Sequence, residues 1–496
     1  MIIPHFINGK EIAPENNTQY DIYNPATGDV TAAVVAATQA EIETAVEAAS
    51  TAFLSWSQVS PQRRARVLFS FKQLLENNIE KLAKAITLEH GKTIEDATGE
   101  VQRAIECVEF SCGTPYLLKG SYSENVASGI DTYTIRQPLG VCVGIAPFNF
   151  PVMISVWMMV PALACGNTFI LKPSEKDPSS TLLLAALMKE AGLPDGVFNI
   201  LQGDQKTVDA LITHEKVTAV SSVGSTVAAK HIYQTAIQQG KRAHTFGGAK
   251  NHCVVMPDAD LNETADAICG AAYGAAGERC MAISVVVAVT DAVADALIAE
   301  LKTRIKKLKI GSGLQEKMDM GPLVTKIHLE HVRSCVERGV NEGAELIVDG
   351  RNYQDKHDPG GFFMGACLFD RVKPSMRIYQ DEVFGPVLCV MRVNELDEAI
   401  SLINQNPYGN GVAIFTNDGG VAKIFASRVT VGMIGVNVAI PVPIAYHTFG
   451  GWKQSAFGDI AMHAEENVRF YTREKTVTLR FQKNSGKKNN FQMPTH

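Results

Sequence analysis

The sequence predicts an α/β protein with two doubly wound α/β domains and a small β-strand arm suited to oligomerisation. A chain of 496 residues is too long for one ordinary hydrophobic core, so at least two domains are expected. From residue 140 onward, short apolar runs alternate with segments of helical periodicity, which is typical of a parallel sheet covered by helices. Two alternating segments, near residues 132 and 477, lie outside that pattern.

The first domain is predicted to begin before this alternating region. Residues 5–12 indicate a short strand or hairpin, and residues 40–112 are charged and helix-periodic. Buried strands are then predicted at 141–146, 167–173, 197–203 and 217–224, and helices at 151–166, 179–192, 206–214 and 225–240. The loops at the carboxyl ends of such parallel strands are the expected nucleotide site.

A second set of the same kind begins near Asn251. Its apolar runs are 251–256, 283–289, 383–393, 411–417 and 431–437, and its predicted helices are 265–276, 296–308 and 395–405. We therefore expect a second α/β domain of similar build.

The two isolated segments predict a protruding arm. The segment from Thr132 to Ile135 favours an exposed strand, and Val477, Leu479 and Phe481 alternate with polar residues. Exposed strand edges invite pairing with another subunit, so a homodimer or homotetramer is expected. Residues 483–496 are polar and lysine-rich and predict a flexible tail.

Composition argues against several classes of function. The net charge of −6 gives no reason to expect nucleic acid as a partner. No run of about 18 apolar residues predicts a membrane span, and the first ten residues lack the basic start and apolar core of a signal peptide. The ten cysteines include no CxxC pair and match neither zinc spacing nor a disulfide frame. We expect a cytoplasmic enzyme without a metal site.

Cys280 departs from the other cysteines, many of which lie among apolar residues and are expected to be buried and inert. It follows a glycine- and alanine-rich stretch, GAAYGAAGERC, which lets a substrate approach the backbone closely. Arg279 adjoins it, and a neighbouring cation lowers the pKa of a thiol from about 8.5 and enriches the reactive thiolate. Taken alone, the local pattern favours the alternative, a cysteine that only packs against small residues.

Asn149 is the second candidate. It lies between Pro147 and Pro151, directly after the first strand of the alternating region, and the two prolines fix its backbone. A rigid amide donor at a strand end can hold a developing oxyanion. An amide that only satisfies the backbone of its own loop is an equally good interpretation.

Two further segments favour a nucleotide, and a third holds a carboxylate and an aromatic residue beside a turn. Lys172 and Glu175 follow the second strand and can reach both hydroxyls of a ribose, although such a pair also occurs by chance on surfaces. Ser225 opens a helix, where free N–H groups suit a pyrophosphate or where the serine serves only as N-cap. Glu382 and Phe384 lie beside a glycine-proline turn. Neither a GxGxxG nor a Walker A sequence is present.

These five segments, in this order and at these separations, resemble the aldehyde dehydrogenase superfamily over about residues 5–480. The resemblance implies an NAD-binding domain, a catalytic domain and a bridging strand pair that builds dimers and tetramers. It implies these boundaries: 1–122 and 140–247 for the NAD-binding domain, 248–440 for the catalytic domain, 441–469 for a return to the NAD-binding domain, and 123–139 with 470–482 for the oligomerisation arm.

The resemblance also implies roles. Cys280 is then the nucleophile that forms a thioester, and Asn149, with the backbone N–H of Cys280, is the oxyanion hole. The implied NAD ligands are Lys172 and Glu175 at the adenosine ribose, Ser225 at the pyrophosphate, Glu382 and Phe384 at the nicotinamide ribose, and Ala146, Phe148, Lys176 and Gly247 along the same cleft.

One segment departs from the superfamily. Hydrolytic members carry a glutamate in a segment like ELGGK, and it activates the water that releases the acid. Here the segment is HTFGGAKNH, in which Thr245 or Phe246 holds that place and neither can act as a base. GAKNH and GERCMA resemble the branch of CoA-acylating methylmalonate-semialdehyde dehydrogenases, which pass the acyl group to coenzyme A. A hydrolytic NAD-dependent enzyme that releases a free carboxylic acid is the alternative function.

That branch binds the substrate carboxylate with two arginines, which map onto Arg103 and Arg279. A guanidinium pair recognises a carboxylate through paired hydrogen bonds that lysine does not reproduce. The alternative for Arg103 is an intrahelical partner for Glu106 or Glu100. Glu278 stands where the wider superfamily commonly carries a glutamine.

Overall fold

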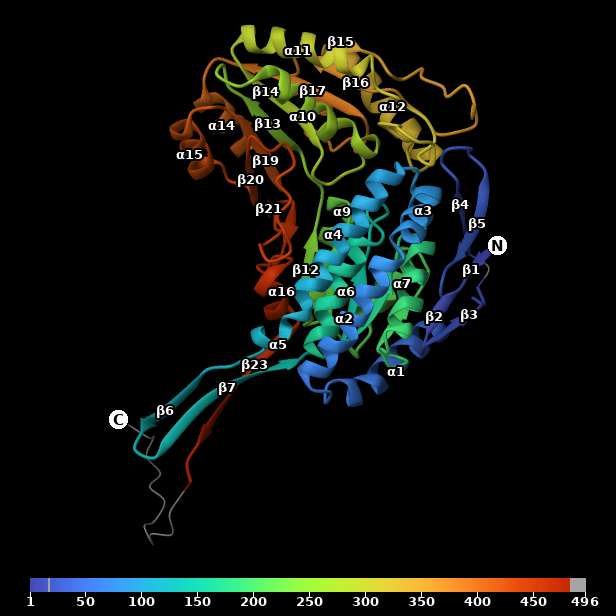
Figure 1. The fold of residues 1–496 in the computed structure, drawn as a ribbon, viewed down its shortest axis with the longest axis vertical. Helices are drawn as coiled ribbons and strands as arrows, with labels where there is room; N and C mark the ends of the chain where they lie inside the picture. Colours follow the sequence, from blue (N-terminus) through green and yellow to red (C-terminus); the bar gives the residue numbers. More distant parts are fainter. Residues whose placement is uncertain (17, 482–496) are drawn as a thin grey trace.

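The computed structural model describes residues 1–16 and 18–481. Two large sheets covered by helices form the body, and a three-stranded arm projects from it (Figure 1). The predicted α/β class with two doubly wound units and an arm is confirmed. The predicted tail, residues 483–496, lies outside the described residues, as does residue 482 of the predicted arm.

The eight-stranded sheet has five parallel strands in the order β12-β11-β8-β9-β10, with antiparallel strands at its edges. The chain winds from β8 through β9 to β10, and then returns to the other side of β8. Strand order therefore reverses between β8 and β11, the place where doubly wound sheets bind ligands. The strands are β22 (Ala456–Phe457), β12 (Arg242–Phe246), β11 (Val217–Val223), β8 (Val141–Ile145), β9 (Thr168–Lys172), β10 (Phe198–Ile200), β2 (His5–Ile7) and β3 (Lys10–Ile12).

Helices cover both faces of this sheet. The central helix, α6 (Met153–Cys165), is buried along its whole length and packs against α2 and α4. A helix that is apolar all round belongs in such an interior position. The other helices of this part are α1 (Gln39–Trp56), α2 (Pro61–Asn77), α3 (Ile79–His90), α4 (Ile94–Cys112), α5 (Thr114–Leu117), α7 (Ser179–Glu190), α8 (Gln205–Thr213), α9 (Thr226–Gln238) and α16 (Ala464–Phe470).

The seven-stranded sheet repeats the arrangement, and all its pairs are parallel except β15 with β16. Its strands are β15 (Glu345–Val348), β16 (Cys367–Asp370), β17 (Val387–Val393), β14 (Ile283–Val289), β13 (Asn251–Val255), β19 (Gly411–Phe415) and β20 (Met433–Val436). Its helices are α10 (Leu261–Tyr273), α11 (Asp291–Ile305), α12 (Lys326–Asn341), α13 (Arg377–Gln380), α14 (Leu396–Gln405) and α15 (Gly419–Arg428).

Residues 247–250 carry the chain directly from β12 into β13. The carboxyl end of the first sheet therefore meets the amino end of the second. Cys280 precedes β14 and Glu382 precedes β17, which both run parallel to β13 in the same sheet. Both residues consequently lie at the junction between the sheets.

The helix predicted over residues 265–276 ends earlier, at Tyr273. A short 3-10 turn follows, in which Ala275 and Ala276 adopt left-handed φ angles of 49° and 51°. Gly277 continues the turn at φ 74°, and a Cβ there would come within 2.2 Å of the Gly385 carbonyl oxygen. Helical periodicity is overridden because this backbone must pass closely by the loop that carries Glu382.

Two small sheets complete the body, and a third sheet forms the arm. The small sheets contain β1 (Ile2–Ile3), β5 (Val30–Val35) and β4 (Gln19–Tyr23), and β18 (Tyr408–Gly409) with β21 (Trp452–Lys453). In the arm, β7 (Ile130–Pro138) pairs with β23 (Thr472–Leu479) on one side and β6 (Tyr122–Ala127) on the other. The two strands predicted from distant segments are thus direct neighbours, with Thr132 opposite Thr478. No helix within residues 1–16 and 18–481 is long and apolar enough to cross a membrane.

Candidate active site

A cleft of about 760 Å³ lies where the carboxyl ends of the first sheet meet the second. Loops after β8, β9, β11 and β12 line one part of it, and the segments before β14 and β17 line the other. Eleven of the thirteen residues singled out from the sequence line this cleft: Ala146, Phe148, Asn149, Lys172, Glu175, Lys176, Ser225, Gly247, Cys280, Glu382 and Phe384. Arg103 and Arg279 are not among its lining residues.

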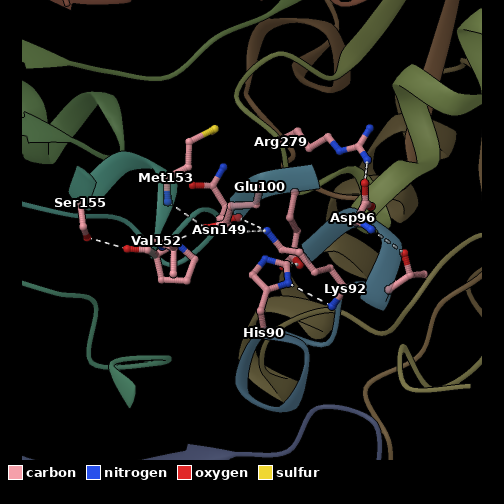
Figure 2. Close-up of polar contacts among 12 residues, drawn as sticks. His90, Lys92, Asp96, Glu100, Asn149, Val152, Met153, Ser155 and Arg279 are labelled. Atoms are coloured by element: carbon pink, nitrogen blue, oxygen red, sulfur yellow. Dashed lines mark hydrogen bonds and ion pairs between the residues drawn. The ribbon is translucent and has the colours of Figure 1, made fainter. Parts of the chain in front are cut away.

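A buried ion pair fixes the backbone of the loop that carries Asn149. Lys92, in the loop between α3 and α4, pairs with Glu100 at 2.8 Å and donates a hydrogen bond to the Asn149 carbonyl (Figure 2). Glu100 in turn accepts hydrogen bonds from the amides of Val152 (2.8 Å) and Met153 (3.1 Å), at the start of α6. This network fixes the backbone from the Asn149 carbonyl to the start of α6.

The side-chain amide of Asn149 is left free by this network. No described residue hydrogen-bonds to it, so the alternative of an amide that satisfies its own loop is not observed. Asn149 is only 3% exposed and still lines the cleft. An amide donor in that position can meet a ligand oxygen.

Cys280 is partly exposed to the cleft, whereas the other nine cysteines are buried, as predicted. Its carbonyl accepts hydrogen bonds from the side-chain amides of Asn251 (2.8 Å) and Asn410 (3.0 Å), which fix the backbone of the loop. Burial, followed by the charge of Glu382, raises the pKa of the thiol to about 12. Arg279 lowers this pKa, as expected, but burial and the charge of Glu382 outweigh its effect, so the net shift is upward.

The two arginines are engaged elsewhere. Arg279 forms an ion pair with Asp96 on α4 and donates to the Gly270 carbonyl at 3.3 Å (Figure 2). Arg103 pairs with Glu106 at 2.5 Å, which is the structural alternative considered from the sequence. Asp96 and Arg103 lie seven residues apart on α4, about two turns, and so share one face of the helix. The structure places both arginines around α4 without a contact between them.

The predicted nucleotide residues lie together at the carboxyl edge of the first sheet. Lys172 and Glu175 form an ion pair at 3.0 Å. Burial alone would raise the pKa of Glu175, but the charge of Lys172 and hydrogen bonds outweigh it and lower the pKa. Ser225 caps α9 by accepting a hydrogen bond from the Ala228 amide, so the N-cap interpretation holds while the residue also lines the cleft.

Aromatic rings form the wall between the two parts of the cleft. Phe148 packs edge-on against Phe384, with ring centroids 5.8 Å apart, and lies 5.9 Å from the stacked ring of His90. The ammonium group of Lys176 lies 4.3 Å from the Phe148 ring centroid. The wall joins residues of both sheets.

Neither residue at the place of the hydrolytic glutamate presents a base. Thr245 is buried and donates its hydroxyl hydrogen to the Ala229 carbonyl at 2.9 Å. Phe246 is buried in the core. A carboxylate does contact the chain three residues after Phe246: Glu382 accepts a hydrogen bond from the Ala249 amide at 2.9 Å. Burial raises the pKa of Glu382 to about 7.

A buried cluster next to the cleft was not expected from the sequence. Glu278, two residues before Cys280, is fully buried, and burial raises its pKa to about 8. One carboxyl oxygen lies 3.5 Å from His328 and accepts a hydrogen bond from the Val324 amide. The other lies 3.7 Å from the Nε2 atom of His90, and neither of these two atoms has a hydrogen-bond partner among the described residues. The glutamine-to-glutamate departure was the only signal for it.

Within residues 1–16 and 18–481, no three His, Cys, Asp or Glu side chains are grouped so as to hold a metal ion.

The sequence model of the aldehyde dehydrogenase family matches residues 12–477. A malonate-semialdehyde dehydrogenase from Pseudomonas aeruginosa is 54% identical over 492 residues, which cover 99% of this chain and 99% of that protein.

Solved structures agree closely with the fold. A protein from Sinorhizobium meliloti, provisionally named a methylmalonate-semialdehyde dehydrogenase and solved in complex with NAD, superimposes with a TM-score of 0.97 at 51% identity, covering 98% of this chain and 99% of the other. A methylmalonate-semialdehyde dehydrogenase from Oceanimonas doudoroffii gives a TM-score of 0.96 at 49% identity, covering 97% and 99%.

Proposed function

The chain belongs to the aldehyde dehydrogenase family, and from this premise we propose that it catalyses the NAD-dependent, CoA-acylating oxidation of methylmalonate or malonate semialdehyde. The products are propionyl-CoA or acetyl-CoA and CO2. The names of relatives that are 49–54% identical support the substrate class. One observation supports the acylating outcome: Thr245 and Phe246 offer no base where hydrolytic members carry one.

The residues of the cleft fit a dinucleotide. The paired Lys172 and Glu175 offer a donor and an acceptor to ribose hydroxyls, and the amino end of α9 offers free N–H groups to a pyrophosphate. We propose that Ala146, Phe148, Lys176, Gly247, Glu382 and Phe384 complete this site. NAD bound there supplies the acceptor for the hydride of the aldehyde. In this proposal the first sheet binds the cofactor and the second carries the nucleophile.

The first half of the reaction uses Cys280 and Asn149. The Cys280 thiolate attacks the aldehyde carbon, and the carbonyl oxygen becomes an oxyanion. The free amide of Asn149, with the backbone N–H of Cys280, donates hydrogen bonds to that oxygen. Loss of one such donor typically costs about 3 kcal/mol in the barrier. Loss of the hydride then leaves an acyl thioester on Cys280.

The second half passes the acyl group to a thiol. The thioester of this substrate carries a β-carboxylate, and it loses CO2 readily because the resulting enolate is delocalised into the thioester carbonyl. The α-carbon of the enolate then takes up a proton, which gives the acetyl or propionyl thioester. The coenzyme A thiolate then attacks the thioester carbon and releases the Cys280 thiolate. This two-stage scheme is the usual one for a cysteine nucleophile.

The experiment that tests the proposal follows NADH formation from malonate semialdehyde with and without coenzyme A. We expect one turnover per site without coenzyme A and continuous turnover with it. Equally fast continuous turnover without coenzyme A would instead establish a hydrolytic enzyme that releases a free acid.

We also propose that the arm mediates assembly into a homodimer or homotetramer. Its three strands project away from the body, and the outer edge of β6 is solvent-exposed (Figure 1). Unpaired strand edges of this kind bind other strands readily. Light scattering of the full chain, compared with a Thr132→Pro variant of β7, would test it; a monomer in both cases contradicts the proposal.

A further inference from the structure

A small second cavity lies beside Cys280, on the side of β13 and β17. Its volume is about 20 Å³, and its lining includes Cys280, Glu382, Asn251, Ala249, Arg279 and Gly277. A cavity that offers a water-sized probe at least 10–15 Å³ can hold one water molecule when polar groups surround it. This cavity therefore has the size and the lining for a single water between the thiol and the carboxyl group.

The chemistry of Cys280 requires a proton acceptor. The thiol is the resting form at neutral pH, because burial raises its pKa to about 12. The thiolate is the nucleophilic form, so a proton has to leave before the attack. Thr245 is committed to the Ala229 carbonyl, Phe246 carries no titratable group, and Arg279 is paired with Asp96. Among the residues that line the small cavity, Glu382 is the one carboxylate.

The position of the Glu382 carboxyl group is well fixed. The Ala249 amide donates to its Oε1 atom at 2.9 Å. A Cβ on Gly248 would lie 2.3 Å from its Oε2 atom, so the carboxyl group rests against a backbone that only glycine provides. No described residue donates a hydrogen bond to Oε2. One oxygen anchors the group, and the other is available to accept a proton.

We propose that Glu382 is the base that deprotonates Cys280, through one water held in the small cavity. The S–H bond of Cys280 breaks, the water takes that proton, and one of the water's own protons passes to Oε2. The net result is a Cys280 thiolate and a neutral Glu382 carboxyl group, with the water regenerated. This inference rests on the proposed function only in taking Cys280 as the nucleophile.

The charges around Glu382 suit this exchange near neutral pH. Burial raises its pKa to about 7, and the hydrogen bond from the Ala249 amide and then the charge of the buried Lys250 limit the rise. Arg279 also acts on Cys280, and the charge of Glu382 acts on Tyr408 in β18. A base is most effective when its pKa lies near the working pH.

The test measures Cys280 reactivity directly, without NAD, aldehyde or coenzyme A. The full chain is treated with iodoacetamide between pH 5 and 10, and alkylation of the peptide containing Cys280 is followed by mass spectrometry. We expect the wild-type rate to rise with an inflection near pH 7. Glu382→Gln keeps the Ala249 contact through its amide oxygen but accepts no proton. Its rate at pH 7.5 should fall by about 10²-fold, the low end for loss of a positioned base, and its inflection should move to alkaline pH.

Asp381→Asn is the matched control, because it removes the same charge one residue earlier, at a side chain paired with Arg377. Its alkylation profile should match the wild type. Gly248→Ala, which displaces the carboxyl group instead of neutralising it, should also slow alkylation if Glu382→Gln is poorly folded. An unchanged profile in both Glu382→Gln and Gly248→Ala, or an equal loss in Asp381→Asn, overturns the proposal. The result is independent of the coenzyme A assay, because alkylation involves no acyl acceptor.

Discussion

The ammonium group of Lys92 donates a hydrogen bond to the backbone carbonyl of Asn149 from a position that is 1% exposed (Figure 2). Lys92 is also the ion-pair partner of Glu100, which accepts the two amides that begin α6. The orientation of the Asn149 amide therefore depends on a charge that never contacts the cleft.

Lys92→Met should destabilise the fold by about 3–5 kcal/mol, because it leaves the Glu100 carboxylate buried without its cation. Urea unfolding at pH 7 measures this change. Lys92→Met combined with Glu100→Gln should recover part of the loss. Lys72→Met is the control, since Lys72 pairs with Glu76 on the surface, where such pairs contribute about 0–1 kcal/mol. Similar losses in both single variants would contradict the structural role of Lys92.

Ala276→Gly should stabilise the protein by about 1 kcal/mol. Ala276 holds a left-handed φ of 51°, which costs an L-residue with a Cβ about 1–2 kcal/mol and costs glycine little. The neighbouring Gly277→Ala should have the opposite effect and abolish activity, because its Cβ would meet the Gly385 carbonyl oxygen at 2.2 Å. Thermal melts of the two variants provide the measurement, and a lower melting temperature for Ala276→Gly would refute the idea of strain.

Glu278→Gln should flatten the pH dependence of stability. The pKa of this carboxyl group is raised from about 4.5 to about 8 in the folded protein, so the folded state holds the proton more tightly than the unfolded state. Stability from this group is complete below pH 4.5 and is lost as the pH rises towards 8. Relative to wild type, the variant should gain about 1–3 kcal/mol between pH 5 and pH 8, measured by urea unfolding at both values. A constant difference across this range would show that Glu278 does not titrate there.

Arg103→Ala should raise the KM for malonate semialdehyde by at least about tenfold and leave the KM for propanal unchanged, because only the first substrate carries a carboxylate. Steady-state kinetics with both aldehydes test this. Glu106→Gln is the matched control: it removes the charge that pairs with Arg103, while the guanidinium keeps its hydrogen bond to the Pro443 carbonyl, so the KM for malonate semialdehyde should stay equal or fall. Equal effects of Arg103→Ala on both aldehydes would leave only the helical ion pair as its role.

Sequence patterns were sufficient for the large elements and for most of the cleft. Alternating apolar runs and helices specify a doubly wound sheet, and the topology of such a sheet alone brings Asn149, Lys172 and Ser225 to one edge. The arm was also predicted, since both of its segments read as strands outside the large sheets, but the pairing of β7 with β23 was only implied by the family resemblance.

Other features depend on three-dimensional burial, which periodicity does not encode. The early end of α10 at Tyr273 follows from the close passage of Gly277 by Gly385. The raised pKa of Cys280 comes from desolvation, although the sequence shows only the adjacent Arg279. In the sequence, Lys92 and Glu100 are two ordinary charged residues near the start of a helix. Only the structure shows that they form a buried ion pair next to Asn149.

The arm can be completed only late in synthesis, because its strands come from distant parts of the chain. Thr132 and Thr478 face each other across β7 and β23 but are 346 residues apart in the chain. At translation rates of about 5–20 residues per second, β7 waits roughly 20–70 s for its partner strand to leave the ribosome. During that interval β6 and β7 form an isolated hairpin, which is marginally stable in water at best. The nascent chain therefore exposes one edge of β7 until almost the last residues are made, and this edge is where premature pairing between neighbouring nascent chains would begin.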